Sequence, residues 1–315
     1  MAAAWLQRFE RGAAGRIRPR PRTISTVREL LPKLASLNDL SLEWIRRPVV
    51  EDLFSELAGQ TPRRAEMALV LLKRILRSAE ERGQAVDPAV FHVRVAKPEE
   101  REPLFLTWEE ADELRSWLPE HVSRIVPIAI LTMLRRGEVL AVRDRDLDLE
   151  TGSISVVAQS QDGGRVRTKT RAGRRTVDVG PTAIKLLREQ QLVLAPNADG
   201  VLFATATGRP FDPNNFMNRL FKPAARAAGM PALTFHDLRH TGASLMIAAG
   251  CHVKVIAEQM GHADGGALVL RRYGHLYKGA RRQAAMALEA HVFDAAKNPG
   301  VRTTFVGAQL GLELE

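Results

Sequence analysis

The chain contains little cysteine and no long apolar run. A single cysteine, Cys251, among 315 residues excludes an internal disulfide and a cysteine-based metal cluster. No run of about 18 apolar residues occurs, so a hydrophobic membrane-spanning segment is not expected. The first eight residues become charged too early to form the apolar core of a signal peptide. These absences predict a reduced, cytoplasmic protein.

Signatures of nucleotide and metal cofactors are missing as well. The sequence has no glycine-rich phosphate loop followed by Lys and Ser or Thr, and it has neither a His-Glu-x-x-His nor a Cys-x-x-Cys pattern. We therefore expect the protein to work without ATP, without a metal and without any other cofactor.

Acidic residues are in the minority. The chain has 46 Lys and Arg against 36 Asp and Glu, which gives a net charge of +10. Hydrophobic residues make up 45% and charged residues 26%, as in ordinary globular proteins, and the length suffices for two domains. A basic excess suits a protein that neutralises nucleic-acid phosphates. A basic protein without such a partner has the same composition.

Apolar periodicity and proline content divide the chain. Residues 1–85 are expected to form a helical domain. Residues 86–103 contain three prolines and no helical stripe, which is typical of a linker. Residues 104–298 are expected to form a second domain, and residues 299–315 a C-terminal tail.

The clearest helix of the first domain is predicted between Thr61 and Gly83. Thr61-Pro62 is a typical helix start, Gly83 is a typical end, and apolar residues recur between them at helical spacing. The opposite face carries arginines that either are solvated or contact a DNA backbone. Those that we expect to contact DNA are Arg63, Arg64 and Arg74. The arginine-rich arm before residue 23 is either a solvated leader or a phosphate-contacting strap.

The second domain is predicted to be mainly α with a small antiparallel β-sheet (α+β). A capping box from Thr107 to Glu110 begins a helix that runs to about Trp117, and residues 122–134 continue as a helix with a kink or a late start at Pro127. Further elements are a hairpin of Ser153–Ala158 with Arg165–Thr170, a third strand over Arg174–Val179, and helices at about 181–194, 213–228, 236–249, 252–260 and 279–296.

The most specific stretch is Thr-Phe-His-Asp-Leu-Arg-His-Thr, at residues 234–241. His236 and Arg239 are three residues apart, so they share a helical face and can hold one anion. The chain has only two tyrosines, Tyr273 and Tyr277, both in the sequence Tyr-Gly-His-Leu-Tyr. A phenol downstream of an anion site can act as a nucleophile. The pattern indicates phosphoryl transfer to a protein side chain.

Three further residues extend this pattern. Arg135 ends an apolar helix, where its guanidinium can bind phosphate in bidentate fashion, although a surface arginine with a local salt bridge has the same sequence context. Glu138 can orient an arginine or a histidine. His262 follows Gly261 at a loop and can donate a hydrogen bond to a phosphate oxygen.

The predicted hairpin is strongly basic. Alternate side chains of a strand share one face, so four cations can line up on it. The hairpin either contacts phosphate or is simply solvated, and a lysine within it can protonate a leaving oxygen. The aligned cations are Arg165, Arg167, Lys169 and Arg171.

In their order and local sequence these residues resemble the tyrosine recombinases, the phage integrase family. The matching segments, between about Leu104 and Val292, are Leu-Arg-Arg-Gly-Glu at 134–138, Thr-Lys-Thr at 168–170, His-Asp-Leu-Arg-His-Thr at 236–241, Gly261-His262 and Tyr273. The basic helical domain resembles the family's core-binding domain. The resemblance implies a DNA substrate and six catalytic side chains supported by Glu138: Arg135, Lys169, His236, Arg239, His262 and Tyr273.

The resemblance also implies their roles. Arg135 and Arg239 would clamp the scissile phosphate, His236 would bind it and move a proton, and His262 would bond a non-bridging oxygen. Lys169 would protonate the 5′-oxygen leaving group.

Tyr273 would attack and form a 3′-phosphotyrosyl link. The interval of eleven residues from His262 to Tyr273 is slightly longer than is usual in the family, which leaves Tyr277 as an alternative nucleophile.

A family member of this size, similar to the Xer-type enzymes, would exchange strands between two DNA duplexes and would be nucleoid-associated. Its site would be an imperfect inverted repeat, and the protein would be a monomer in solution and a homotetramer on DNA. The amphipathic segment 281–296 would dock on a neighbouring protomer or pack on its own domain, with residues 300–315 as a swapped tail. Two alternatives stay open: a type IB topoisomerase and a catalytically silent DNA-binding protein on the same scaffold.

Overall fold

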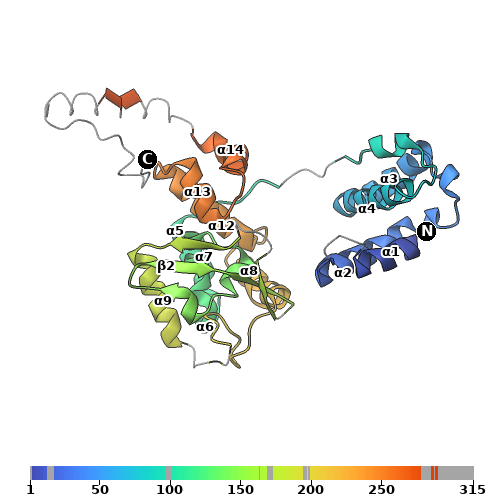
Figure 1. The fold of residues 1–315 in the computed structure, drawn as a ribbon. Coiled ribbons are helices and arrows are strands. Elements are labelled where there is room, and N and C mark those ends of the chain that lie inside the picture. The colour runs from blue at the N-terminus through green and yellow to red at the C-terminus, as the bar shows by residue number, and fades with distance from the viewer. Residues whose placement is uncertain are drawn as a thin grey trace, which may run out of the picture. The chain divides into compact units, whose positions relative to one another are not determined.

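The protein divides into two compact units, Met1–Glu102 and Pro103–Glu315 (Figure 1). Each unit has a hydrophobic core of its own. The structure, a computed structural model, describes residues 2–12, 18–96, 101–162, 164–168, 173–193, 197, 199–277, 285–286 and 288–289. The expected helix at 279–296 and the tail at 299–315 lie outside these residues, apart from two short pieces of the helix.

The first unit is helical throughout its described residues. Its elements are α1 (Ala2–Arg11), α2 (Pro21–Leu30), the 3₁₀ helices η1 (Leu31–Leu37) and η2 (Leu42–Trp44), α3 (Arg47–Gln60), α4 (Pro62–Glu80) and the 3₁₀ helix η3 (Pro88–His92). Helix α4 buries eight side chains at helical spacing against the other helices, so this amphipathic stripe forms the centre of the core.

The predicted helix after Thr61 is confirmed as α4, although its ends differ in detail. Thr61 makes no side-chain cap, and Pro62 occupies the first turn, where a missing N–H costs no hydrogen bond. Gly83 has a φ of 76° and closes the helix with a hydrogen bond to the Glu80 carbonyl. Val90 and Val93 are buried in the same core, so packing of the first unit continues into the segment that we expected to be a linker.

The second unit places its helices around one apolar segment. Helix α7 buries nearly every side chain, as a helix that is apolar on all sides should, and it contacts α5, α9 and α12. The helices are α5 (Trp108–Ser116), α6 (Glu120–Ser123), α7 (Ile125–Thr132), α8 (Arg136–Val139), η4 (Asp144–Asp146), α9 (Pro181–Val193), α10 (Pro213–Phe216), η5 (Met217–Phe221), α11 (Lys222–Ala227), α12 (Phe235–Ala248), α13 (Val253–Met260), α14 (Ala267–Tyr273) and η6 (Gly274–Tyr277).

Two predicted features at the start of this unit are confirmed. The Thr107 hydroxyl accepts from the Glu110 backbone N–H at 3.2 Å, and the Glu110 carboxylate accepts from the Thr107 N–H at 2.8 Å. The predicted helix at 122–134 is divided at Arg124 into α6 and α7. Pro127 is the third residue of α7, where no intrahelical donor is needed, so the late start is the correct alternative.

The predicted helix at 213–228 contains one turn of a different kind. Between α10 and α11, η5 is a π-helical turn in which the Lys222 N–H bonds the Met217 carbonyl, five residues back. Pro223 follows directly. In a regular α-helix its ring would clash with the carbonyl of Arg219, and the wider turn relieves that clash.

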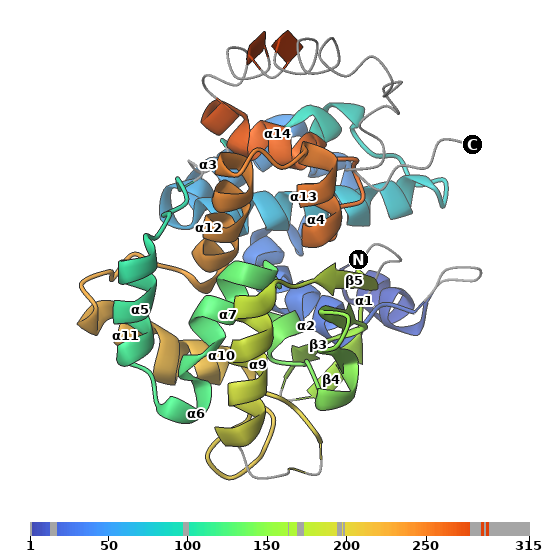
Figure 2. The same cartoon turned by 90° about the vertical axis from the view of Figure 1, so that its left-hand side faces the viewer.

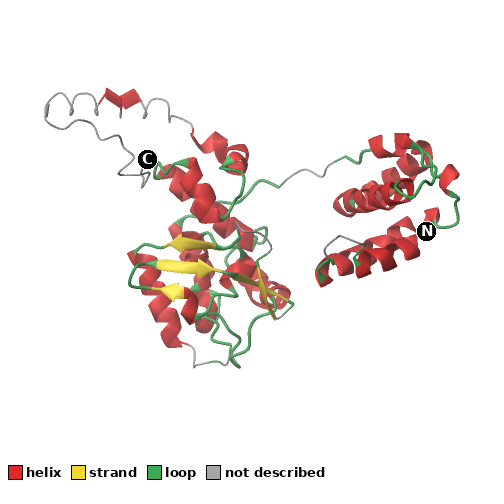
Figure 3. Cartoon of the chain, in the orientation of Figure 1, coloured by secondary structure: helices red, strands yellow, loops and turns green. Residues whose placement is uncertain are grey.

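Strands occur only in the second unit among the described residues (Figure 3). One antiparallel sheet has the order β1 (Leu147–Asp148), β2 (Ser153–Val156), β5 (Arg175–Asp178), and a separate pair joins β3 (Ala158–Gln161) to β4 (Gly164–Arg167). The basic strand of the predicted hairpin is present in part as β4, but it pairs with Ala158–Gln161, and Asp162 in the turn has a φ of 51°.

The predicted partner of Ser153–Val156 was wrong. This strand pairs with β5, where Ile154 stands opposite Val177 and both are buried. The basic segment 165–170 offers a single apolar side chain, Val166, so it cannot match the buried face of β2.

A smaller apolar cluster joins the end of α7 to the last helices. It consists of Met133 with residues of α12, α13 and α14, and it includes the ring of Tyr273. These three helices lie together in both views (Figures 1 and 2). No helix among the described residues is long and apolar enough to cross a membrane.

Close packing of α12 on α7 depends on Gly242. A Cβ atom at this position would overlap the backbone carbonyl of Ile130 and press on the Met133 side chain. We expect Gly242→Ala to lower the free energy of unfolding by about 1–3 kcal/mol, because the two helices must move apart. Gly180→Ala in the same unit is the control, since no atom lies within 4 Å of its added Cβ. Equal urea midpoints for the two variants would contradict this packing.

Candidate active site

The end of α7 brings a backbone carbonyl into the site. Met133 adopts a left-handed conformation with a φ of 50°, which is unfavourable for a residue with a side chain and has to be held by its surroundings. Its carbonyl accepts a hydrogen bond of 2.5 Å from Nη1 of Arg239 on α12. The strained turn therefore also fixes the arginine.

Arg239 is a buried cation that is hydrogen-bonded to no carboxylate in the part of the chain that the structure describes. Its side chain is 1% exposed, and Nη2 donates to the Met260 carbonyl at 2.6 Å and lies 3.1 Å from Nε2 of His262. Burial and the charge of Arg135 lower its pKa to about 9, so it stays charged at neutral pH. Its Nε has no hydrogen-bond partner. A buried charge in this state is prepared to bind an anion.

His262 faces the same space from the loop after α13. Gly261 ends that helix with a φ of 68°, and His262 follows it. If Nε2 accepts from Arg239, Nδ1 carries the proton, and this buried Nδ1 has no partner. Burial and the charges of Arg239 and Arg135 lower the His262 pKa to about 4, so the ring is neutral. It offers one N–H donor.

Arg135 is oriented by a buried carboxylate. Its Nη1 donates to Glu138 at 2.8 Å and its Nη2 to the Gly261 carbonyl at 3.2 Å, while 39% of the side chain stays exposed. Glu138 is 3% exposed and also accepts two hydrogen bonds, at 3.2 and 3.0 Å, from Arg175 on β5. Burial raises the Glu138 pKa, but the bonds from Arg175 and the charge of Arg135 outweigh it and leave the pKa lowered.

Tyr273 lies at the end of α14, and its side chain is buried against α12. It is 1% exposed, and its phenol is hydrogen-bonded to Nδ1 of His240. The His240 ring in turn meets the His236 ring edge to face, with centroids 4.5 Å apart. Burial raises the Tyr273 pKa to about 12, and burial lowers the pKa of both histidines to about 4. The phenol is therefore protonated and the imidazoles are neutral.

Helix α12 is fixed at its start by its own polar residues. Asp237 accepts hydrogen bonds from the Thr234 N–H at 2.7 Å and from the Leu104 N–H at 3.3 Å. The Thr241 hydroxyl accepts from the Leu106 N–H at 3.1 Å. The extended segment that enters the second unit is thus attached to the helix that carries His236, Arg239 and His240.

Of the six residues predicted to be catalytic, the structure brings together five. Arg135, His236, Arg239, His262 and Tyr273 line one region of the second unit, with Glu138 behind Arg135, whereas Lys169 lies outside the described residues. Prediction from sequence left out His240 and Arg175. A signal for His240 was present, because it is four residues after His236 and so shares its helical face. Arg175 gave no signal beyond the basic hairpin.

The hairpin arginines differ from one another. Arg165 donates from Nη2 to Asp146 at 2.7 Å and from Nε to the Ala141 carbonyl at 3.1 Å, so this cation fixes the hairpin to its own unit. Arg167 is exposed. Arg171 lies outside the described residues.

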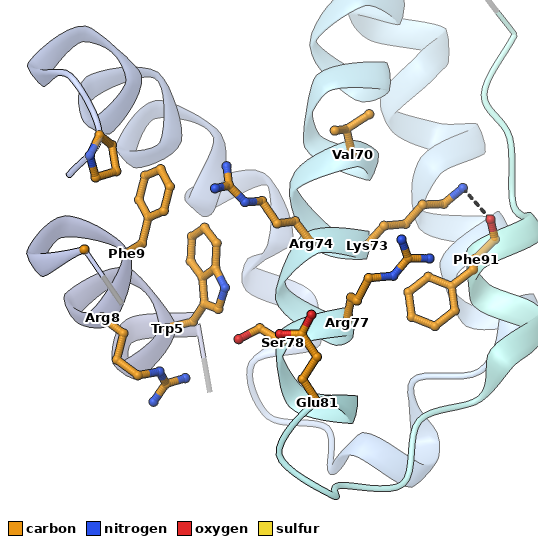
Figure 4. A pocket seen from close by; sticks show the side chains of 12 residues that line it. Trp5, Arg8, Phe9, Val70, Lys73, Arg74, Arg77, Ser78, Glu81 and Phe91 are labelled. Carbon is orange, nitrogen blue, oxygen red and sulfur yellow. Dashed lines mark hydrogen bonds between the residues drawn. The ribbon is translucent and has the colours of Figure 1, made fainter. Parts of the chain in front are cut away.

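The arginines of α4 also have different surroundings. Arg63 is exposed and paired with Glu66, and Arg64 is exposed with its nearest carboxylate, Glu29, at 4.0 Å. Arg74 borders a cavity of about 520 Å³ within the first unit (Figure 4). Its guanidinium lies 4.6 Å from the Phe9 ring centroid, in cation–π contact.

A family model, related sequences and solved structures match this chain. The model of the phage integrase family matches residues 104–279. A protein named as the prophage phiRv2 integrase of Mycobacterium tuberculosis is 28% identical over 282 residues, which are 85% of this chain and 73% of that protein.

Two solved structures have a similar fold. The Tn1549 transposon integrase in complex with transposon right end DNA has a TM-score of 0.74 at 19% identity and covers 90% of this chain and 97% of its own. A lambda integrase tetramer bound to a Holliday junction has a TM-score of 0.66 at 20% identity and covers 84% and 78%.

Glu138→Gln tests the carboxylate behind the arginines. We expect the free energy of unfolding at pH 7 to fall by about 1.5–3 kcal/mol, because hydrogen bonds to a charged group are lost from a buried position. The folded-state pKa of Glu138 is lowered, so its stabilisation is complete above the unfolded pKa and is lost as pH falls through the folded pKa. Wild type and variant should therefore differ most above the unfolded pKa and converge in urea unfolding only once the pH falls below the lowered folded pKa of Glu138. A difference that does not depend on pH would contradict this role.

Proposed function

Because this chain belongs to the phage integrase family, the tyrosine recombinases, we propose that Tyr273 is its nucleophile and that Arg135 and Arg239 hold the scissile phosphate. The chain is a site-specific DNA recombinase, and enzymes of this family cut and rejoin DNA through a 3′-phosphotyrosyl intermediate. The observation that carries the assignment of residues is the buried, charged Arg239. Its Nε has no hydrogen-bond partner among the described residues, and its charge lowers the pKa of the Tyr273 phenol against the effect of burial.

The geometry supports different roles for the side chains around the phosphate. Arg239 offers a fixed positive charge within the protein, and Arg135 offers a half-exposed guanidinium that Glu138 and the Gly261 carbonyl orient. His262 supplies the unpaired Nδ1–H for a non-bridging oxygen. Donors that are preorganised in this way stabilise the charge of a pentavalent transition state.

His236 completes the site from the first turn of α12. Its ring is neutral, so it can donate one hydrogen bond to the phosphate and shuttle a proton. In the reaction the Tyr273 oxygen bonds to phosphorus, and the 5′-oxygen leaves. The energy of the broken phosphodiester is retained in the phosphotyrosine, which would make ATP unnecessary.

Lys169 is proposed as the general acid. In the sequence it comes two residues after the end of β4, and an ammonium group that reaches the site would protonate the departing 5′-oxygen. Arg63, Arg64 and Arg167, which are exposed, are proposed to contact the DNA backbone, together with Arg74 and Arg171. Arg165 is a weaker candidate, because its guanidinium is engaged with Asp146.

Strand exchange between two duplexes is the proposed outcome, on an imperfect inverted repeat and in a homotetramer. The lambda integrase tetramer on a Holliday junction, a structural neighbour, supports this assembly. A type IB topoisomerase would instead rejoin the same duplex, and a silent binder would form no covalent link. The polar residues gathered near Tyr273 argue against the silent binder, because DNA binding alone needs no buried phenol hydrogen-bonded to a histidine.

Covalent capture tests the nucleophile. Wild type is incubated with fragmented DNA of the source genome and denatured with SDS, and the DNA that stays attached is sequenced. We expect an adduct enriched at an inverted repeat, its loss in Tyr273→Phe, and its retention in Tyr277→Phe. An adduct that survives in Tyr273→Phe but disappears in Tyr277→Phe would reassign the nucleophile.

A sulfur-substituted substrate tests Lys169. In the recovered duplex the 5′-bridging oxygen at the cleaved bond is replaced by sulfur, which leaves as a thiolate and needs little protonation. We expect Lys169→Ala to be slowed by about 10²–10⁴-fold on the oxygen substrate and to be close to wild type on the sulfur substrate. Arg239→Lys is the control, because impaired phosphate binding should be slow on both. A Lys169→Ala defect of the same size on both substrates would exclude a general acid.

A further inference from the structure

The proton of the attacking phenol needs an acceptor, and the structure offers one. Among the described side chains, only His240 hydrogen-bonds the Tyr273 phenol, through Nδ1. The contact is buried, with both residues nearly inaccessible to solvent. Water is therefore poorly placed to take the proton while the phenol stays in this position.

We propose that His240 is the general base of the reaction, an inference that rests on the proposed function of Tyr273. In cleavage, the phenol oxygen bonds to phosphorus, the bond from phosphorus to the 5′-oxygen breaks, and the phenol proton passes to Nδ1 of His240. The 5′-oxygen takes a proton from the general acid. In rejoining, the 5′-hydroxyl attacks phosphorus, its proton returns to the general acid, and His240 returns its proton to the departing phenol oxygen.

Neutral His236 could also accept a proton, but the described hydrogen bond of the phenol goes to His240, and the remaining polar groups nearby are unsuited to this step. Arg239 and Arg272 have no acceptor atom. Nε2 of His262 already faces Arg239 at 3.1 Å, and the Asp237 carboxylate accepts from Thr234 and Leu104 at the start of α12. Position and hydrogen-bonding capacity therefore point to His240.

The protonation states fit a base that acts only during the reaction. His240 is neutral, so Nδ1 can accept, and the high pKa of Tyr273 keeps the proton on the phenol before substrate binds. Burial is the main cause of the lowered His240 pKa; electrostatic interaction with His236 and the charges of Arg272 and Arg239 lower it further, and Asp237 opposes them. A bound phosphodiester would offset part of this positive charge. Bonding to phosphorus also acidifies the phenol, so the transfer becomes favourable as the attack proceeds.

The His236 ring supports this arrangement from the other side. It packs edge to face on His240, one helical turn away on the same face of α12. The His240 ring packs in turn on the Tyr273 ring, with centroids 5.6 Å apart. Three rings in sequence hold the phenol oxygen at Nδ1, which limits the rotation of the tyrosine before attack.

The test compares two substitutions of His240. The substrate is the duplex recovered by covalent capture, and it carries a nick beside the cleavage point so that the cut end diffuses away. We expect His240→Ala to form the adduct about 10²–10⁴-fold more slowly than wild type, with DNA binding retained. His240→Asn keeps an acceptor close to the position of Nδ1 but cannot take up a proton, so it should be similarly slow.

Added imidazoles separate a base from a positioning contact. Imidazoles of graded basicity should accelerate His240→Ala, and the rescued rate should rise with their basicity, as a proton transfer requires. His275→Ala is the matched control: His275 is exposed on η6, two residues after Tyr273, and this variant should cleave at the wild-type rate without any response to imidazole.

Three results would overturn the inference. These are wild-type speed in His240→Ala, wild-type speed in His240→Asn, and rescue of His240→Ala that does not depend on basicity. In each of these cases a wild-type adduct at Tyr273 would leave the proposed function intact. No adduct from wild type would contradict that function itself, and this inference with it.

Discussion

The site depends on one constraint: a charged guanidinium is buried in the second unit and is hydrogen-bonded to no carboxylate of the described residues. Arg239 is held by the carbonyls of Met133 and Met260, which stabilise a cation without neutralising it. This arrangement requires a left-handed turn at the end of α7 and a glycine where α12 crosses α7. A buried charge without a neutralising partner is costly, and under the proposed function the scissile phosphate would offset that cost. The strained turn and the close packing of α12 on α7 hold this guanidinium in place.

The second arginine is held differently, and the difference has a physical meaning. Glu138 neutralises part of the charge of Arg135 and Arg175, and it leaves Arg135 half exposed. One guanidinium is thus fixed within the protein, while the other is oriented at the surface, where a DNA backbone can reach it. Tyr273 lies on α14, and its phenol is hydrogen-bonded to His240, the residue that follows Arg239 on α12. The negative charge of a bound phosphodiester would raise the His240 pKa, and it would thereby favour transfer of the proton from Tyr273 to His240 during the attack.

Many of the helices and most of the candidate site residues could be predicted from the sequence, because they depend on residues that are close together in the chain. The capping box at Thr107, the helix after Thr61 and the late start at Pro127 follow from neighbouring residues. The motif at 236–241 predicted an anion site because helical spacing alone puts His236 beside Arg239. Strand pairing was missed, since alternation defines the buried face of Ser153–Val156 but not its partner. Arg175 and His240 were missed because their roles depend on contacts 37 and 33 residues away in the chain.

The proposed chemistry requires above all that the buried phenol of Tyr273 becomes bonded to DNA. The most direct measurement is mass spectrometry of the trapped adduct after nuclease and trypsin digestion. Trypsin cuts after Arg272 and Lys278, so both tyrosines fall in one short peptide, and fragmentation has to assign the attached nucleotide. We expect the nucleotide on Tyr273, attached through a phosphodiester. A nucleotide on Tyr277, or on a residue outside this peptide, would contradict it.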